Sequence, residues 1–302
     1  MCALFACNKN DIYEKLAEEE QKLADYIAAT YGDAAINLGG GAFLVKLVEQ
    51  QDSVVIEPGD YIICNRRVTN QITEELEYTS DLSNMKFQDS YVKGGPEILR
   101  ILESKFDEGV ILMTKGEKGK IYIPSRWLFN DFEPRIFYVD IVEVIKSLPE
   151  YQHDLMFEYV RKICKKGAYV DTVKNIASTS DKTSNNIVMY YIMDKGKGDV
   201  ITDGLNVETK TSISFLLQDS KINNYTSEQK QTWNSNKIDT PLTSSNFMGE
   251  ILKKMKKGGK VVVAVPSKLY WDDDNLPTPV NEFGQFNIPR WSVVVFTIVI
   301  NN

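Results

Sequence analysis

The order of apolar and polar positions divides the chain into two halves that run through similar elements. Apolar residues recur largely at helical spacing near the start of the chain, among Glu and Lys, at Ile12, Leu16, Leu23, Tyr26 and Ile27. This spacing predicts an amphipathic helix. Residues 155–163 repeat the pattern at the start of the second half, so we expect each half to open with a helix.

Strands are predicted at matching places behind the two helices. Residues 42–48 and 187–193 are rich in β-branched and aromatic side chains, and each half ends on a stronger run of the same kind, at 136–142 and 292–300. Such runs are typical of strands.

A longer shared segment strengthens the parallel between the halves. Residues 110–125 and 251–267 each contain the end of a short helix with Met-x-Lys-Gly, a tight turn, a strand and Pro-Ser. Glycine after a helix is the left-handed cap, and Lys there complements the helix dipole. Duplication explains the repeated order better than chance.

The length of the chain agrees with two hydrophobic cores. Its 302 residues exceed the usual size of one core. We predict a short leading segment at 1–10, a helix plus domain at 11–147, and a second helix plus domain at 148–302.

Composition and charge exclude several classes of function. A content of 43% hydrophobic and 25% charged residues is that of a folded protein. A net charge of −7 argues against nucleic acid as a partner. The single histidine, His153, lies in a polar stretch without a second His or Cys at metal-ligand spacing nearby, which disfavours triad and metal chemistry. We predict no metal and no cofactor, and we interpret Cys64 and Cys164 as lone buried thiols.

Short motifs follow one another in the same order in both halves. The first half has Gly59-Asp60, Tyr78-Thr79-Ser80, Phe106-Asp107-Glu108-Gly109-Val110, Met113-Thr114-Lys115-Gly116 and Ile123-Pro124-Ser125. The second half has Gly198-Asp199, Tyr225-Thr226-Ser227, Met255-Lys256-Lys257-Gly258, Val265-Pro266-Ser267 and Ile288-Pro289. This ordered set resembles the FKBP-type peptidyl-prolyl isomerases over most of residues 40–147 and 185–301.

The resemblance implies an α+β fold with two FKBP-like domains. Each would be a curled antiparallel sheet of about five strands around a short helix, preceded by its amphipathic helix, with a shallow apolar cavity between sheet and helix. Such a cavity accelerates rotation about a prolyl bond by favouring the twisted, less polar amide, so no nucleophile or metal is required.

The positions that match the family pocket differ between the halves. In the first half Arg66 replaces the wall tyrosine and Thr79 the carboxylate. The remaining matches in that half are Phe106 for the tryptophan floor, Phe129 for the late tyrosine and Val139 for the phenylalanine of the last strand. We expect these to be ordinary core residues, with Arg66 drawing solvent into the cavity and leaving this half inactive.

The second half keeps more of the aromatic lining, although the carboxylate is missing there too. The residues predicted to contact a substrate are Phe215, Tyr225, Trp271 and Phe296. Whether they line a groove or a core stays open, as does the choice of Met248 or Phe247 for the floor. Residual activity is expected to vanish in Trp271→Ala or Phe215→Ala and to survive in Phe129→Ala.

The first residues suggest a membrane anchor. Leu4-Phe5-Ala6-Cys7 resembles a bacterial lipobox, in which the cysteine is lipidated, and Asn8-Lys9-Asn10-Asp11 would form a polar tether. Only six residues precede Cys7, too few for a full signal peptide, so the alternative is an incidental cysteine. No other apolar run is long enough to span a membrane. We therefore expect contact with a membrane by a lipid anchor only, in the bacterial cell envelope, on the periplasmic or outer-membrane side.

Three functions are compatible with these observations. The first is an envelope lipoprotein whose FKBP-like domains bind polypeptide or prolyl-peptide clients, with weak or absent isomerase activity. The second is an active peptidyl-prolyl cis-trans isomerase. The third is a structural or assembly module of a cell-surface complex, in which the fold is only a scaffold.

Overall fold

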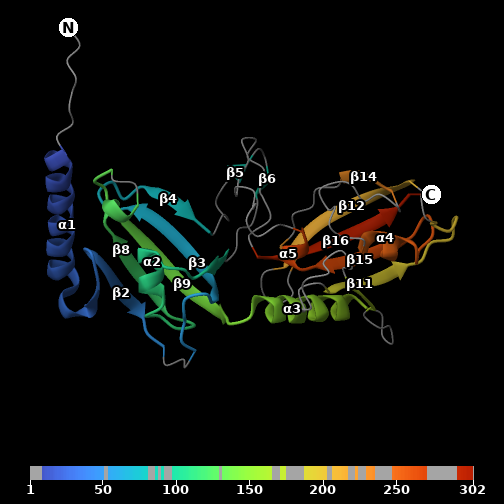
Figure 1. Ribbon diagram of the computed structural model, residues 1–302, viewed down its shortest axis with the longest axis horizontal. Coiled ribbons are helices and arrows are strands. Elements are labelled where there is room, and N and C mark those ends of the chain that lie inside the picture. Colours follow the sequence, from blue (N-terminus) through green and yellow to red (C-terminus); the bar gives the residue numbers. More distant parts are fainter. Residues whose placement is uncertain are drawn as a thin grey trace, which may run out of the picture. The chain divides into compact units, whose positions relative to one another are not determined.

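The computed structural model describes residues 9–50, 54–80, 86–87, 90–91, 97–128, 131–164, 171–174, 187–202, 206–216, 222–223, 229–234, 247–270 and 291–301. The chain divides into two compact units, Met1–Lys146 and Ser147–Asn302 (Figure 1). Each unit combines helices with an antiparallel sheet.

The first unit begins with a long helix and then alternates strands with one short helix. Its helices are α1 (Lys9–Tyr31) and α2 (Lys105–Val110), and its main strands are β1 (Ala35–Gly39), β2 (Ala42–Val48), β3 (Tyr61–Asn70), β4 (Leu76–Thr79), β7 (Glu97–Arg100), β8 (Lys118–Ile123) and β9 (Arg135–Ile145). The sheet order is β1-β2-β8-β9-β3-β4, and β7 also pairs with β3. Strands β5 (Lys86–Phe87) and β6 (Ser90–Tyr91) pair with each other.

The second unit repeats this arrangement. Its helices are α3 (Leu148–Ile163), α4 (Phe247–Leu252) and α5 (Ser267–Tyr270), and its strands are β10 (Asp171–Lys174), β11 (Ile187–Asp194), β12 (Asn206–Leu216), β13 (Ile222–Asn223), β14 (Gln229–Asn234), β15 (Lys260–Val265) and β16 (Val293–Ile300). The order is β10-β11-β15-β16-β12-β13, with β14 also on β12. Strands β2, β8, β9 and β3 thus correspond to β11, β15, β16 and β12.

The turn after each short helix fixes the register of this correspondence. Gly116 and Gly258 have φ of 83° and 78°, a backbone conformation that favours glycine. Their N–H groups donate to the carbonyls of Ile141 (2.7 Å) and Ile300 (3.1 Å) on the last strand of each unit. Ile141 and Ile300 are therefore equivalent positions.

Each sheet carries a long helix on one face and a short helix on the other. Alternate residues of β8 point to opposite faces of the sheet. Ile121 and Ile123 share a hydrophobic cluster with residues of α2, Phe106 and Val110. Tyr122 shares another cluster with Leu23 of α1. Such alternation is the period of a strand. In the second unit β15 divides its residues in the same way between α4 and α3.

Local signals explain where the helices begin. Ser104 and Asp107 form a reciprocal capping box at the start of α2. Helix α3 starts at Leu148, seven residues before the predicted segment, with Pro149 in its first turn, where a missing N–H is harmless. In α1 the predicted residues Leu16, Leu23 and Ile27 are buried.

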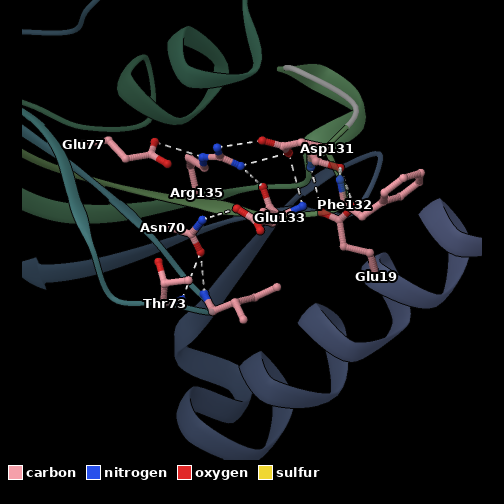
Figure 2. Close-up of polar contacts among 10 residues, drawn as sticks. Glu19, Asn70, Thr73, Glu77, Asp131, Phe132, Glu133 and Arg135 are labelled. Atoms are coloured by element: carbon pink, nitrogen blue, oxygen red, sulfur yellow. Dashed lines mark hydrogen bonds and ion pairs between the residues drawn. The ribbon is translucent and has the colours of Figure 1, made fainter.

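A buried polar link joins α1 to its sheet. The carboxylate of Glu19 accepts hydrogen bonds from the backbone N–H (2.7 Å) and the hydroxyl of Ser125, and Ser125 Oγ accepts one from the N–H of Phe132 (3.1 Å). Figure 2 shows Glu19 on α1 beside Phe132. Phe132 has φ of 63°, an unusual conformation for an aromatic residue, and this link holds its N–H in place.

The second unit has the same link built from an amide. Gln152 of α3 donates to Ser267 Oγ (2.8 Å) and to the carbonyl of Trp291, and it accepts from the Ser267 N–H (3.3 Å). Trp291 also has φ of 63°. A helix, a Pro-Ser turn and a strained aromatic residue are thus joined twice, by a carboxylate and by an amide.

A buried arginine anchors the segment before β9 (Figure 2). The Arg135 guanidinium contacts Glu77 (2.9 Å) and both carboxylate oxygens of Asp131 (2.9 and 2.7 Å). Burial alone would raise the pKa of Asp131, but the hydrogen bond from Arg135 lowers it below its ordinary value. These contacts hold Asp131 in its charged form.

The turn between β3 and β4 is tied to the same segment. Asn70 Nδ2 donates to the Glu133 carboxylate, and its Oδ1 accepts from the N–H groups of Ile72 (2.8 Å) and Thr73 (3.1 Å). Figure 2 shows Asn70 between Thr73 and Glu133. The side chain thus replaces a backbone partner for the turn.

Candidate binding site

A cavity of about 310 Å³ lies in the first unit beside the start of α2. Its walls come from β3, β7, α2, β8, the turn after β8, and β9. The lining residues are Arg66, Leu99, Arg100, Ser104, Lys105, Phe106, Asp107, Ile123, Trp127, Leu128 and Phe137. The volume is at the lower end of the range for small-ligand sites.

The floor of the cavity is aromatic. The ring centroids of Phe106 and Phe137 are 5.3 Å apart with an interplanar angle of 46°, and both side chains are buried. Ile123 is buried beside them in the same cluster. Tilted rings at this distance attract each other in addition to burying apolar area, so this floor is formed before any ligand arrives.

Trp127 forms an exposed aromatic wall. It is 48% exposed, yet its indole N–H donates to the Gly40 carbonyl (2.9 Å) and the Lys105 ammonium lies 5.0 Å from the ring centroid. Gly40 has φ of 58°, and a Cβ there would lie 2.7 Å from the indole ring. The close approach of Gly40 therefore depends on glycine, and it holds an exposed ring in a fixed orientation.

Arg66, which lines the cavity, belongs to a charged cluster with two residues outside the lining. Arg66 forms a forked ion pair with Glu97 (Nε–Oε1 2.8 Å, Nη2–Oε2 3.3 Å), and the Tyr78 hydroxyl donates to Glu97 Oε2 (2.8 Å). The guanidinium carbon is 4.8 Å from the Tyr78 ring centroid and 5.6 Å from that of Phe106. This arrangement combines a bidentate pair with cation–π contacts.

The environment fixes the charges of this cluster. Burial raises the pKa of Tyr78 and the negative charge of Glu97 raises it further, so the phenol keeps its proton. Burial opposes the charge on Arg66, but Glu97 more than offsets this and raises the pKa of the guanidinium. The cluster therefore consists of a neutral tyrosine that donates a hydrogen bond to a carboxylate, which is in turn paired with an arginine.

The structure corrects one expectation for the first half. Arg66 is not a solvated charge, because its side chain is only 22% exposed and is paired with Glu97 of β7. Phe106 was expected to be an ordinary core residue; it is buried in the core cluster and also lines the cavity, and Phe129 lies outside the described residues.

The register also corrects the pairing of the two halves. With Ile141 equivalent to Ile300, Phe296 corresponds to Phe137 and not to Val139. Arg66 lies opposite Val139, whereas Thr211 lies opposite Ile298, so Arg66 corresponds to Thr211 and not to Phe215.

The residues predicted to bind substrate in the second half are only partly described. Phe296 is 1% exposed and belongs to the same hydrophobic cluster as Met248 and Ile251 of α4. The backbone of Phe215 pairs with Val294 in the sheet. Three further residues named from the sequence, Tyr225, Trp271 and Cys7, lie outside the described residues.

The described residues contain neither a metal-binding cluster nor a helix that could span a membrane. Within these ranges no group of three or more His, Cys, Asp or Glu side chains is arranged to hold a metal ion. No helix in the described part of the chain is long and apolar enough to cross a membrane.

No protein-family model and no curated protein matches the sequence. Among solved structures, the chain is similar to a peptidyl-prolyl cis-trans isomerase from Pseudomonas syringae pv. tomato (13% identity, 44% of this chain and 96% of that one, TM-score 0.34). It is also similar to FkpA from Escherichia coli, with 17% identity over 45% of this chain and 64% of that one and a TM-score of 0.35. A third similar structure contains the three FKBP domains of wheat FKBP73, with 11% identity over 89% of this chain and 98% of that one and a TM-score of 0.29. These neighbours are FKBP-type proteins, at identities and TM-scores too low to assign a family or an activity to this chain.

Proposed function

We propose that the chain binds apolar or proline-containing segments of other polypeptides in the cavity of the first unit, with weak or absent prolyl isomerase activity. The observation that carries the proposal is the preformed aromatic floor of Phe106 and Phe137 beside the exposed wall of Trp127. A proline ring has the size and apolar character for such a cavity, and its burial at about 25 cal/mol per Å² is favourable.

The same geometry argues against efficient turnover. A twisted prolyl amide gains most from a free donor or an oriented dipole at the reacting bond. Here the Tyr78 proton and two N–H groups of Arg66 are committed to Glu97. A bound peptide would therefore meet an aromatic floor beside an arginine that is already paired with Glu97, which supports binding more than catalysis.

We also propose that the binding units belong to a bacterial envelope protein anchored through a lipid on Cys7. The support is the lipobox-like string 4–7 and the polar tether behind it. Expression from a gene with its upstream leader, followed by detergent partitioning and intact mass, tests the proposal. A soluble product with unmodified Cys7 contradicts it.

A prolyl-peptide experiment on the full chain tests the binding function. Binding of a fluorescent Ala-Ala-Pro-Phe amide and its isomerisation rate should be measured for the wild type, Phe106→Ala and Trp127→Ala. We expect measurable binding that weakens at least fivefold in both variants, with turnover little above the uncatalysed rate. Absence of binding by the wild type at millimolar peptide contradicts the proposal.

Variants of the second unit distinguish the two candidate sites. Trp271→Ala and Phe215→Ala alter the residues that the sequence pattern favoured. If they abolish binding while Phe106→Ala does not, the site is in the second unit. An isomerase rate comparable to an efficient enzyme would instead favour the second candidate function, an active isomerase, for which the aromatic cavity is the supporting observation.

A further inference from the structure

We infer that the cavity of the first unit selects segments in which a carboxylate lies next to the apolar or prolyl residue. The inference rests on the proposed binding function and adds the class of ligand. Its basis is the charge of the lining residues, which include three cations, Arg66, Arg100 and Lys105, and one carboxylate, Asp107.

One oxygen of the single lining carboxylate is already used. Asp107 Oδ2 accepts hydrogen bonds from the backbone N–H of Ser104 (3.0 Å) and from its hydroxyl (2.7 Å), and so completes the capping box of α2. Any ligand cation would compete with these bonds for that oxygen. The carboxylates that neutralise Arg66 and Lys105, Glu97 and Glu108, are not among the lining residues.

Two of the three cations are also committed. Arg66 is held by Glu97 in a forked pair. The Lys105 ammonium contacts Glu108 (2.5 Å), the Leu38 carbonyl (3.3 Å) and the face of Trp127. Neither can turn toward a ligand without losing these partners.

Arg100 is different. It is the exposed last residue of β7, and its guanidinium lies 5.9 Å from the Tyr61 ring centroid. It forms no ion pair with any residue that the structure describes. A guanidinium presents a planar fork of donors that matches a carboxylate, and Arg100 follows Leu99 in the cavity wall, so its charge lies beside apolar surface.

The negative net charge of the chain means that attraction of an acidic ligand has to come from a local cation such as Arg100. At −7 the molecule as a whole repels anions, so a carboxylate is favoured only by short-range contact. Exposed charge pairs contribute modestly and are screened by salt. We expect an acidic neighbour to tighten binding about two- to fivefold at low ionic strength.

Matched peptides on the full chain test the inference. The affinities of Ala-Glu-Pro-Phe, Ala-Ala-Pro-Phe and Ala-Lys-Pro-Phe amides, and of Ala-Ala-Pro-Phe with a free carboxyl end, should be compared at low and high salt. We expect the Glu peptide or the free acid, or both, to bind more tightly than the neutral amide, and the Lys peptide more weakly. The two acidic peptides separate a side-chain carboxylate from a terminal one.

Two arginine variants test whether Arg100 causes the preference for acidic peptides. Arg100→Gln should make the acidic and neutral peptides equal. The control Arg67→Gln should retain the preference, because Arg67 is also an exposed arginine stacked on a tyrosine, 4.2 Å from the Tyr138 ring centroid, but does not line the cavity.

Each outcome decides between the inference and the proposed function. Equal binding of acidic and neutral peptides, or a preference that persists in Arg100→Gln, overturns the inference and leaves the binding function intact. Failure of every peptide to bind the wild type overturns the proposed function itself.

Discussion

Three side chains from three strands form a polar cluster around Arg66, which lines the cavity, and the stability of this cluster depends on one carboxylate. Arg66, Tyr78 and Glu97 come from β3, β4 and β7, and both oxygens of Glu97 are used. Removing one member of a largely buried charged cluster leaves the others without a partner, which costs more than the net value of the interaction.

We expect Glu97→Gln to lower the free energy of unfolding by about 1–3 kcal/mol. The neutral amide cannot balance Arg66, and it offers only one acceptor oxygen to Arg66 and Tyr78. Urea unfolding measures the change. The control is Asp140→Asn, which breaks the more exposed Lys118–Asp140 pair and should cost at most about 1 kcal/mol. A smaller loss in Glu97→Gln than in Asp140→Asn would show that the cluster is not stabilising.

Asp131 should make stability depend on pH in the acid range. Its pKa in the folded chain lies below the ordinary value of 3.8 because Arg135 favours the carboxylate. A depressed pKa adds stability that is fully present above the unfolded pKa and is lost as pH falls through the folded pKa.

The expected result concerns Asp131→Asn. The difference in free energy of unfolding between wild type and variant should be constant above about pH 5 and should shrink as the pH falls below 4. Urea titrations at a series of pH values measure it. A difference that stays constant down to pH 2, or that grows, would mean that Arg135 does not stabilise the charged form.

At the scale of elements, each long helix makes a buried polar link to the turn after a strand of its sheet, and the two links differ in chemistry. Glu19 uses two acceptor oxygens on Ser125, whereas Gln152 accepts from Ser267 and also donates to Trp291. An amide can satisfy the Ser125 N–H as the carboxylate does, but a carboxylate cannot donate to Trp291.

Exchanging carboxylate and amide should therefore reduce stability by different amounts in the two links. Glu19→Ala should cost about 1–3 kcal/mol of stability, because the N–H and hydroxyl of Ser125 lose their acceptor, and Glu19→Gln should cost clearly less. In the second unit Gln152→Glu should cost more than Glu19→Gln, since it places a carboxylate against the Trp291 carbonyl. Thermal unfolding of the four proteins tests this, and equal effects of Glu19→Gln and Gln152→Glu would contradict it.

Helices and strands with a regular spacing of apolar residues, or with a run of β-branched residues, could be predicted from the sequence. Contacts between distant segments could not. The runs at 42–48 and 292–300 coincide with β2 and β16, because a β-branched run has few alternatives. Strands β1, β4 and β7 have no such run. Glu19 and Ser125 are 106 residues apart, and neither position signals the other.

The candidate site shows the same division. Arg66 and Phe106 were located by short motifs in the resemblance. Glu97 was missed because its carboxylate meets Arg66 and Tyr78 only when β7 and β4 both pair with β3. Trp127 was missed because its exposure and its bond to Gly40 depend on the turn after β8. Phe137 and Val139 are two residues apart and lie on the same face of β9, so the alternating pattern of the strand could not decide which of them lines the cavity.

At the scale of the whole molecule, each unit has its own hydrophobic clusters. Among the described residues, each cluster draws its members either from Leu23 to Val144 or from Tyr151 to Ile300. A unit that buries its own core is expected to unfold as its own cooperative element. Met113 and Met255 provide a matched test, because they are equivalent residues and each is 1% exposed.

We expect calorimetry of the full chain to resolve two transitions. Met113→Ala should lower the melting temperature of one transition by roughly 5 to 15 °C and leave the other unchanged, and Met255→Ala should do the reverse, because each creates a cavity in one core worth about 2–5 kcal/mol. The double variant should show both shifts, since distant sites add. A single transition that moves in both single variants would mean that the two units unfold as one, and the division at Lys146 and Ser147 would then describe architecture without describing stability.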